Sequence, residues 1–495
     1  MRRDVLLLSV ATTGLLIIVW HSRSIWNADC PAPPLPQLIS SLPQVTLHNE
    51  TDDIEGKRKL AMSWLEWNGQ SSIVAHGASH AAMAGLSSTS DGLRSSAIEA
   101  TEMVLHTAGN TVFSNLYIYD GAVHIVTDNP AALPELKRIT SNGASLNTGN
   151  SNPTKEDIRV LSVGEAETVF GGSAVVWEGI SWMITEHPEF IAHYYHYTAE
   201  ILLSLQRSTT ALNLTLPPPV RLLFPHTAHA AFRDGPGMNA YVSLAAFPSS
   251  QLLFSDTWAD MHATKRAYKL ERAVIFDRAA AMSGPAHGAS WKPISEAMSL
   301  PTVVEDWWGE VRERVVGFAG GQVLQPGSAE VRKRVVTYVS RQKGNRRALR
   351  REDHAALVNS LHEASEELGF ELNVVELEGM SKAEQIALAA RTTVLMGVHG
   401  NGLTSLVWMR PSPHSAVFEF FMPGGWFRDY EITARSLGIM YRGFWYDTSF
   451  SYPGFNGRDV EGFHSADIPV HALHVVAELR RALLYGLREH VLHDP

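Results

Sequence analysis

One histidine and one asparagine stand among glycines in the segment TTVLMGVHGNGLTSLVWMRP, residues 392–411. Glycines let the backbone of a turn approach a ligand closely. The unpaired N–H groups of a helix that begins near Leu403 attract an anion, phosphate above all. The spacing is neither G-x-G-x-x-G nor a P-loop. The segment therefore predicts an anion-binding turn at the end of a buried strand, with His399 as a donor. An ordinary tight turn with a surface histidine is the alternative.

A second group of reactive side chains lies in residues 190–207, FIAHYYHYTAEILLSLQR, whose apolar spacing predicts a buried helix. His196 and Glu200 are four residues apart, so on a helix they share a face and one can orient the other. Such a pair is suited to general acid–base chemistry, and Asp277 is a further candidate base. His193 lies on the same side, where a half-buried histidine cluster is the plainer interpretation.

A metal site is an alternative use of these histidines. His193 and His196, together with His226 and His229, have ligand-like spacings. Zinc sites more often contain cysteines or an H-E-x-x-H pattern. We therefore expect no metal site in the protein.

The elements that position these residues alternate most plainly in the second half of the chain. We expect strands over residues 335–341, 371–378, 394–398 and 415–421, and helices around 303–316 and over 351–370 and 381–393. The last helix opens with a capping box of Ser381 and Glu384. This alternation predicts a parallel sheet covered by helices on both faces.

The first half of the chain is less regular. NLYIYDGAVHIVTD, residues 115–128, predicts a β-hairpin that turns at Asp120-Gly121. Short apolar runs at 220–225, 251–256 and 272–279 predict buried strands. A chain of 495 residues is expected to form two domains. The division that we expect is an N-terminal α/β domain over 58–290, a C-terminal Rossmann-like domain over 291–465, and a helix within 466–495 that packs back across both.

Residues 399–404, HGNGLT, resemble the HGAGLTN signature of glycosyltransferase family 61, which includes plant core β-1,2-xylosyltransferases and EGF-domain O-linked N-acetylglucosamine transferases. Further pieces agree in order: YYHYTAE at 194–200, YVSR with NRR at 338–347, AEQIALAARTTVLMGVHG at 383–400, and VFEF with Glu419 and Pro423. The resemblance is specific over about residues 331–423. Asn401 and Ser405 depart from the usual alanine and asparagine, which bears on donor specificity.

The resemblance implies a GT-B-like fold of two facing Rossmann-like domains. It also implies an inverting, metal-independent transfer of a sugar, xylose or N-acetylglucosamine favoured, from a UDP-sugar to a glycan or glycoprotein hydroxyl. No cofactor beyond the UDP-sugar donor is expected. The chain contains no D-x-D triplet, the acidic pair with which metal-dependent transferases hold Mn²⁺. A catalytically silent luminal glycan-binding protein of the same fold is the alternative, prompted by Asn401.

Without a metal ion, a leaving diphosphate needs fixed positive partners. Arg341, Arg346 and Arg347 follow a predicted strand, and guanidinium groups suit phosphate oxygens, although the last two also fit a solvated helix start. Glu419, at a strand end, is expected to bind ribose hydroxyls, with an ordinary exposed carboxylate as the alternative. The acid–base group of residues 190–207 is expected to take the acceptor proton. The residues expected to bind the donor are Arg341, Arg346, His399, Gly400, Asn401, Gly402, Leu403, Thr404 and Glu419.

The N-terminus predicts a membrane anchor. A short cationic tail, residues 1–4, precedes an uncharged apolar run over 5–20, which is near the lower limit for a membrane helix, and the tail favours a cytosolic N-terminus. A proline-rich stem over 21–57 would then hold a single-pass type II protein in the lumen of the Golgi or endoplasmic reticulum. A cleaved signal peptide is the alternative. Asn49 and Asn213 lie in N-x-[ST] triplets, and Cys30 is the only cysteine.

The bulk charge excludes one class of partner. The formal net charge is −10, and 45% of the residues are hydrophobic. Proteins that track a phosphate backbone are more often basic. We therefore expect a globular protein with no nucleic-acid partner.

Overall fold

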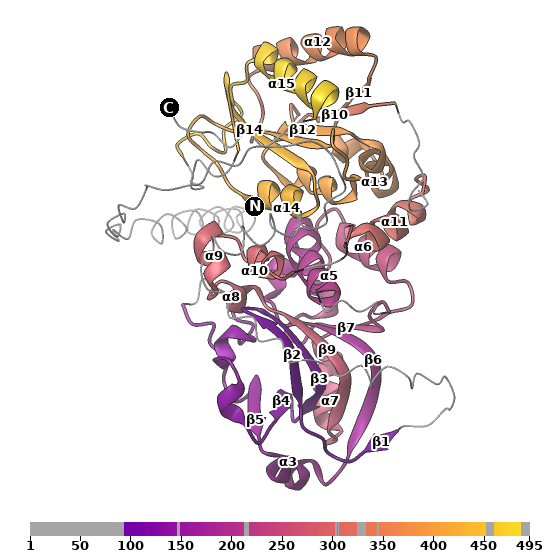
Figure 1. Ribbon diagram of the computed structural model, residues 1–495, viewed down its shortest axis with the longest axis vertical. Coiled ribbons are helices and arrows are strands. Elements are labelled where there is room, and N and C mark those ends of the chain that lie inside the picture. Colours follow the sequence, from indigo (N-terminus) through magenta and orange to yellow (C-terminus); the bar gives the residue numbers. More distant parts are fainter. Residues whose placement is uncertain are drawn as a thin grey trace, which may run out of the picture. The chain divides into compact units, whose positions relative to one another are not determined.

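Two β-sheets, one from each half of the chain, carry the helices of the protein (Figure 1). The computed structural model describes residues 94–145, 149–211, 217–301, 304, 306–323, 333–343, 346–451 and 460–486, all within one unit, Lys57–Pro495. The predicted tail, anchor and stem lie outside these ranges, as do Asn49, Asn213 and Cys30. Among the described helices, none combines the length and apolar character needed to cross a bilayer.

The second sheet has the strand order β11-β10-β12-β13-β14-β15. Its strands are β10 (Val335–Val339), β11 (Glu371–Val375), β12 (Val394–Val398), β13 (Ala416–Phe420), β14 (Met440–Trp445) and β15 (Thr448–Phe450). Neighbouring strands are parallel except for β14 with β15. The carboxyl ends of β10, β12 and β13 therefore meet at one edge, where such sheets bind ligands. The parallel sheet predicted for this half is confirmed, with one short antiparallel strand at its edge.

Helices cover both faces of the second sheet. They are η7 (Leu377–Gly379), α12 (Arg351–Leu368), α13 (Lys382–Arg391), η8 (Asn401–Trp408), α14 (Asp429–Ser436) and α15 (Ala472–Tyr485). Because strand side chains alternate, Val394 and Met396 pack with α12 and α15, whereas Leu395 packs with α13 and η8. Figure 1 shows α12 and α15 on one side of the sheet and α13 and α14 on the other.

The first sheet is mixed, with the main order β5-β4-β3-β9-β6-β7-β8. Its strands are β1 (Ser95–Ser96), β2 (Glu102–Thr107), β3 (Asn110–Tyr119), β4 (Ala122–Val126), β5 (Ile158–Leu161), β6 (Ala174–Ile184), β7 (Arg221–Leu223), β8 (Gln251–Leu253) and β9 (Tyr268–Phe276). The predicted turn at Asp120-Gly121 joins β3 to β4, and so tight a turn forces antiparallel pairing. The strands β9, β6, β7 and β8 form a continuous parallel run, as in a Rossmann-like sheet, and β4 with β5 is a second parallel pair, whereas the pairings of β3 are antiparallel. The expectation of a Rossmann-like first half is thus met in part.

The helix predicted over 190–207 is divided into segments. These are α4 (Pro188–Ile191), the π-helix η5 (His196–Leu202) and α5 (Leu203–Thr210). Turns of π-helix occur frequently at functional sites. The other helices of this half are η2 (Pro130–Ala132), η3 (Leu136–Arg138), α3 (Val163–Phe170), η6 (His229–Ala231), α6 (Met238–Ala246), α7 (Ser255–Ala263), α8 (Arg278–Ala281), α9 (Pro285–Ser290), α10 (Ile294–Met298) and α11 (Gly309–Phe318).

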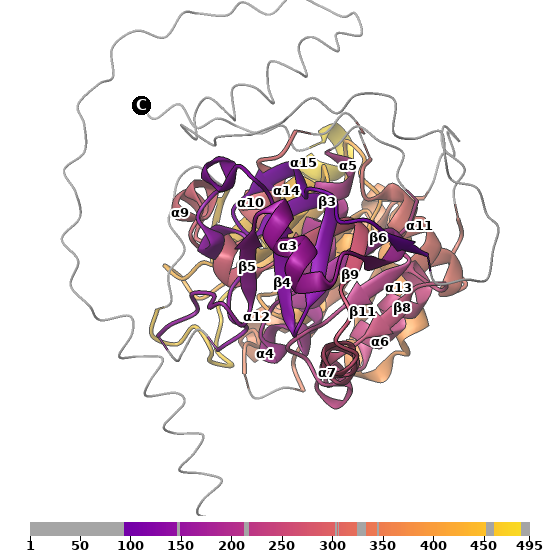
Figure 2. The same ribbon diagram turned by 90° about the horizontal axis from the view of Figure 1, so that it is seen from below.

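Buried tryptophans join the two halves. Trp408 of η8 donates its indole N–H to the Tyr194 hydroxyl at 2.8 Å, and Trp308 donates to the Val407 carbonyl at 2.9 Å. Both indoles are completely buried, where an unpaired N–H would be costly. The first contact holds η8 against the residues just before η5, and the second holds it against the start of α11. Helix α3, in contrast, lies at the end of the first sheet remote from the second (Figures 1 and 2).

Candidate active site

The glycine-rich turn after β12 opens a 3-10 helix. Gly400, with φ of +156°, precedes η8, which begins at Asn401, two residues before the start expected near Leu403. The first N–H groups of a helix lack intrahelical partners, and Asn401 and Gly402 are partly exposed. Leu403 and Thr404 are buried, so they hold the helix in place rather than face a ligand.

A buried carboxylate holds the imidazole of His399. Its Nδ1 lies 2.6 Å from Glu419 Oε1, and the Tyr441 hydroxyl donates to Glu419 Oε2 at 2.5 Å. Burial raises the pKa of Glu419, and the contacts with His399 and Tyr441 offset only part of this effect. Because the Glu419 side chain is completely buried, it is not placed to bind ribose as the sequence suggests. It orients His399 instead.

Aromatic rings enclose His399 on its faces. The Phe421 ring is stacked at 5.4 Å between centroids and the Phe427 ring at 5.9 Å, with Phe463 tilted at 5.5 Å. The imidazole retains 12% exposure, and its Nε2 has no hydrogen-bond partner among the residues that the structure describes. His399 therefore presents one free nitrogen from a largely apolar pocket.

Two arginines lie over the glycine that follows His399. A Cβ atom on Gly400 would overlap Nη1 of Arg341 and come within 3.8 Å of Nη1 of Arg347. Arg347 also bonds His464 Nδ1 at 3.0 Å. No carboxylate of the described residues pairs with Arg341, which leaves its charge for a ligand. Arg346 is exposed and is not among the atoms nearest Gly400, so the turn gathers Arg341 and Arg347 rather than Arg346.

The structure brings His196 and Glu200 together on η5. His196 Nδ1 lies 2.5 Å from Glu200 Oε2, and Arg278 Nε donates to the same oxygen at 3.2 Å. Burial by itself raises the pKa of Glu200, but the charges of His196 and Arg278 outweigh it and hold that pKa well below its usual range. His196 is 22% exposed, so an ionised, buried carboxylate orients an imidazole that solvent reaches.

Side chains of α14 lie between the two histidines. The Tyr430 ring is 5.6 Å from the His399 ring and 5.1 Å from that of Tyr195, which in turn is 5.3 Å from His196. The ring contacts run from one half of the chain to the other without a break. The His196–Glu200 and His399–Glu419 pairs therefore belong to one site.

An ion pair crosses the same site. Lys292 Nζ lies 2.7 Å from Asp429 Oδ1, and the Tyr195 hydroxyl donates to the Asp429 carbonyl at 3.1 Å. Burial raises the pKa of Asp429, but Lys292 and His399 outweigh burial, so its pKa is lowered. Sequence reasoning missed Lys292, Asp429 and Tyr430. The aromatic residues that follow β13 could have pointed to Asp429 and Tyr430. Nothing in the sequence distinguishes Lys292 from other lysines.

Asp277 is a structural residue, contrary to its prediction as a base. It caps α8 by accepting the Ala280 N–H at 2.8 Å. Its other oxygen accepts the Ser141 N–H and hydroxyl, each at 2.7 Å, and the Thr185 hydroxyl at 2.8 Å. The side chain is completely buried, so no acceptor hydroxyl reaches it.

The four histidines considered as metal ligands do not lie together. His193 and His196 rings stand 4.7 Å apart, but His226 packs against Gly143 and His229 against Phe254. Within the described ranges, no three His, Cys, Asp or Glu side chains are grouped as a metal site requires.

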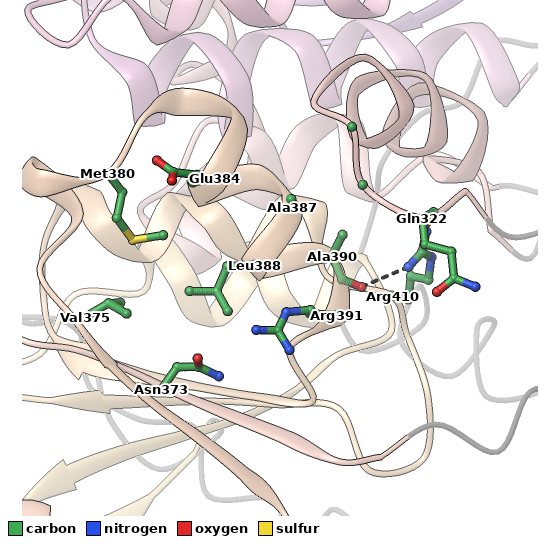
Figure 3. Close-up of a pocket in the computed structure, with 12 residues that line it drawn as sticks. Gln322, Asn373, Val375, Met380, Glu384, Ala387, Leu388, Ala390, Arg391 and Arg410 are labelled. Atoms are coloured by element: carbon green, nitrogen blue, oxygen red, sulfur yellow. Dashed lines mark hydrogen bonds between the residues drawn. The ribbon is translucent and has the colours of Figure 1, made fainter.

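A pocket of about 460 Å³ lies elsewhere, between α13 and the glycines after α11 (Figure 3). Its cations are already paired: Arg410 binds Glu313 and the Ala390 carbonyl, and Arg391 binds Glu371. Paired charges leave no convergent polar group for a ligand. We therefore take the region around His399 and His196 as the candidate site.

Comparison with known families gives the class of the protein. Residues 183–417 match the family model described as Glycosyltransferase 61. The protein is therefore a glycosyltransferase. The match spans just under half of the chain and supports the family that the sequence motifs suggest, glycosyltransferase family 61. The matched range contains His196, Glu200, Arg341 and His399 and ends just before Glu419. No curated protein matched the chain.

Proposed function

We propose that the protein transfers a sugar from a UDP-sugar to a hydroxyl of a glycan or glycoprotein, with inversion and without a metal ion. The observation that carries the proposal is the gathering of Arg341, His399 and the first amides of η8 around Gly400. Such a set suits a diphosphate, because charge-assisted hydrogen bonds and oriented amides stabilise the developing negative charge.

The donor half of the proposed reaction concerns the leaving group. The diphosphate lies against the amides of Asn401 and Gly402, with Arg341 and Arg347 on its oxygens. His399 Nε2, the free ring nitrogen, supplies a further donor. As the bond between the anomeric carbon and the diphosphate oxygen breaks, these groups hold the charge that accumulates on UDP.

The acceptor half concerns the proton. The acceptor oxygen attacks the anomeric carbon from the face opposite UDP, which inverts the centre, and its proton passes to His196 Nε2. Glu200 accepts from Nδ1 and stabilises the imidazolium that forms. Arg278 keeps Glu200 ionised. The proposed roles thus divide between the two halves of the chain.

The finer assignments follow from the sequence. Xylose and N-acetylglucosamine are the favoured donor sugars. An anchor over residues 5–20 would place the enzyme in the membrane of the Golgi or endoplasmic reticulum with its catalytic part in the lumen. Detergent-solubilised protein and a UDP-release assay are therefore the appropriate starting point.

The test is UDP release from a panel of UDP-sugars by the full chain in EDTA. We expect release with at least one donor, a loss of about 100-fold or more in His196→Asn, and a loss in Arg341→Met. Lys343→Met is the matched control, since that exposed cation already pairs with Glu376. A folded protein that binds glycans but releases no UDP from any donor would instead support the glycan-binding alternative.

A further inference from the structure

The free nitrogen of His399 poses a question of proton placement. A neutral imidazole carries one N–H, and Nδ1 is already occupied by Glu419 at 2.6 Å. If Glu419 is ionised and His399 neutral, the proton is on Nδ1 and Nε2 is an acceptor. Such a histidine would repel a phosphate oxygen rather than bind it.

One additional proton on the His399–Glu419 pair changes this outcome. Either the imidazole is doubly protonated beside a carboxylate, or Glu419 is a neutral acid that donates to Nδ1. In both arrangements Nε2 carries a hydrogen. The location of the shared proton therefore does not matter, because only the total held by the pair decides whether Nε2 donates.

The surroundings favour the protonated pair. Glu419 is completely buried, and an uncompensated negative charge is costly there; accordingly, burial raises the Glu419 pKa. Tyr441, itself buried, fixes the second carboxyl oxygen at 2.5 Å. The aromatic rings around His399 keep water from its faces.

We propose that Glu419 and Tyr441 are positioning residues that keep a proton on Nε2 of His399, where it binds the donor diphosphate. The inference rests on the proposed function, since it assumes a diphosphate at this turn. It assigns to Glu419 a role in the transfer reaction that does not require contact with substrate.

Other charged groups face this pair. Asp429 and Tyr430 approach from α14, Arg341 and Arg347 from the segment after β10, Lys292 from between α9 and α10, and His464 from beyond β15. All are retained in a variant of Glu419. UDP itself also titrates identically in every sample. A difference between variant and parent therefore isolates the pair.

Glutamine at position 419 provides a sharp test. Its oxygen can accept from Tyr441 while its NH₂ donates to Nδ1, which reproduces the neutral acid without a titratable proton. We expect Glu419→Gln to retain UDP affinity at pH 6 and to keep it at pH 9. The parent is expected to lose about tenfold or more over that interval as the pair loses its proton.

Two further variants complete the measurement, which is the dissociation constant of UDP by calorimetry in EDTA from pH 6 to 9. Glu419→Leu should bind UDP as weakly as His399→Asn, and the double variant no more weakly than either. Adding Tyr441→Phe to Glu419→Gln should weaken UDP binding again, because the phenol hydroxyl no longer fixes the orientation of the Gln amide. This last variant also serves if Glu419→Leu does not fold.

The inference would be overturned if UDP affinity in Glu419→Gln depended on pH as it does in the parent. It would also be overturned if Glu419→Gln lost as much UDP affinity as Glu419→Leu. Additive losses for Glu419→Leu and His399→Asn would do the same. Failure of the proposed function looks different: the parent chain would then bind no UDP at any pH. The two failures are thus distinguishable in a single series.

Discussion

Replacing Gly400 by alanine would place a methyl group where the guanidinium of Arg341 lies. The guanidinium is the end of a flexible side chain, so it would move aside rather than unfold the turn. A hydrogen bond to a charged group is worth about 1.5–3 kcal/mol, so loss of one such contact predicts a roughly 10- to 150-fold loss in UDP affinity. The φ of +156° adds strain, which acts on stability in addition.

Gly149→Ala is the matched control for strain. Gly149 has φ of +82° and no atom within 4 Å of an added Cβ, so alanine there strains the backbone without displacing a cation. Calorimetry with UDP and thermal unfolding would be measured for both variants. We expect both to lose stability and Gly400→Ala alone to lose UDP affinity. Equal UDP affinity in the two variants would refute the placement of Arg341 at the diphosphate.

Three further results are expected. His196→Asn should lower kcat by about 10²- to 10⁴-fold with little change in KM; an unchanged kcat in single-turnover assays would contradict its role. Asp277→Asn should cost about 1–3 kcal/mol of unfolding free energy while folded enzyme keeps its kcat, and a collapse of kcat at full stability would restore it as a base. Burial lowers the pKa of both His106 and His124 to about 4. Between pH 6.5 and 4 the unfolded chain therefore binds more protons than the folded one. As the pH falls through this range, each histidine lowers the free energy of unfolding by roughly 1.4 kcal/mol per pH unit. Urea midpoints at pH 7.5 and 5 check this, and His124→Phe should weaken the dependence; midpoints independent of pH would contradict it.

The second sheet was predictable because its signals are local. The capping box of Ser381 and Glu384 begins α13 as expected, and each strand is a short apolar run of the kind that a parallel sheet buries. His399 lies at a carboxyl strand end for the same reason. The first sheet was less predictable, because pairings such as β3 with β9 join segments far apart in the chain, and sequence patterns do not specify such partners.

The site was predictable in its members more than in their roles. His196 and Glu200 meet because helical spacing determines their separation. Glu419 was recognisable as a strand-end carboxylate, but the pleat alone does not tell whether it faces a ligand or Tyr441 from β14. Lys292 and Asp429 meet only through packing between the two halves, which is a tertiary property and leaves no local pattern.

The central claim is that protein groups alone hold the diphosphate of the donor. Its most direct test is the affinity of the full chain for UDP and for uridine, measured by calorimetry in EDTA, with Arg341→Met alongside. We predict that UDP binds much more tightly than uridine without a divalent ion, and that Arg341→Met removes most of this difference. Equal affinities for UDP and uridine, or UDP binding that appears only on addition of Mn²⁺, would contradict the claim.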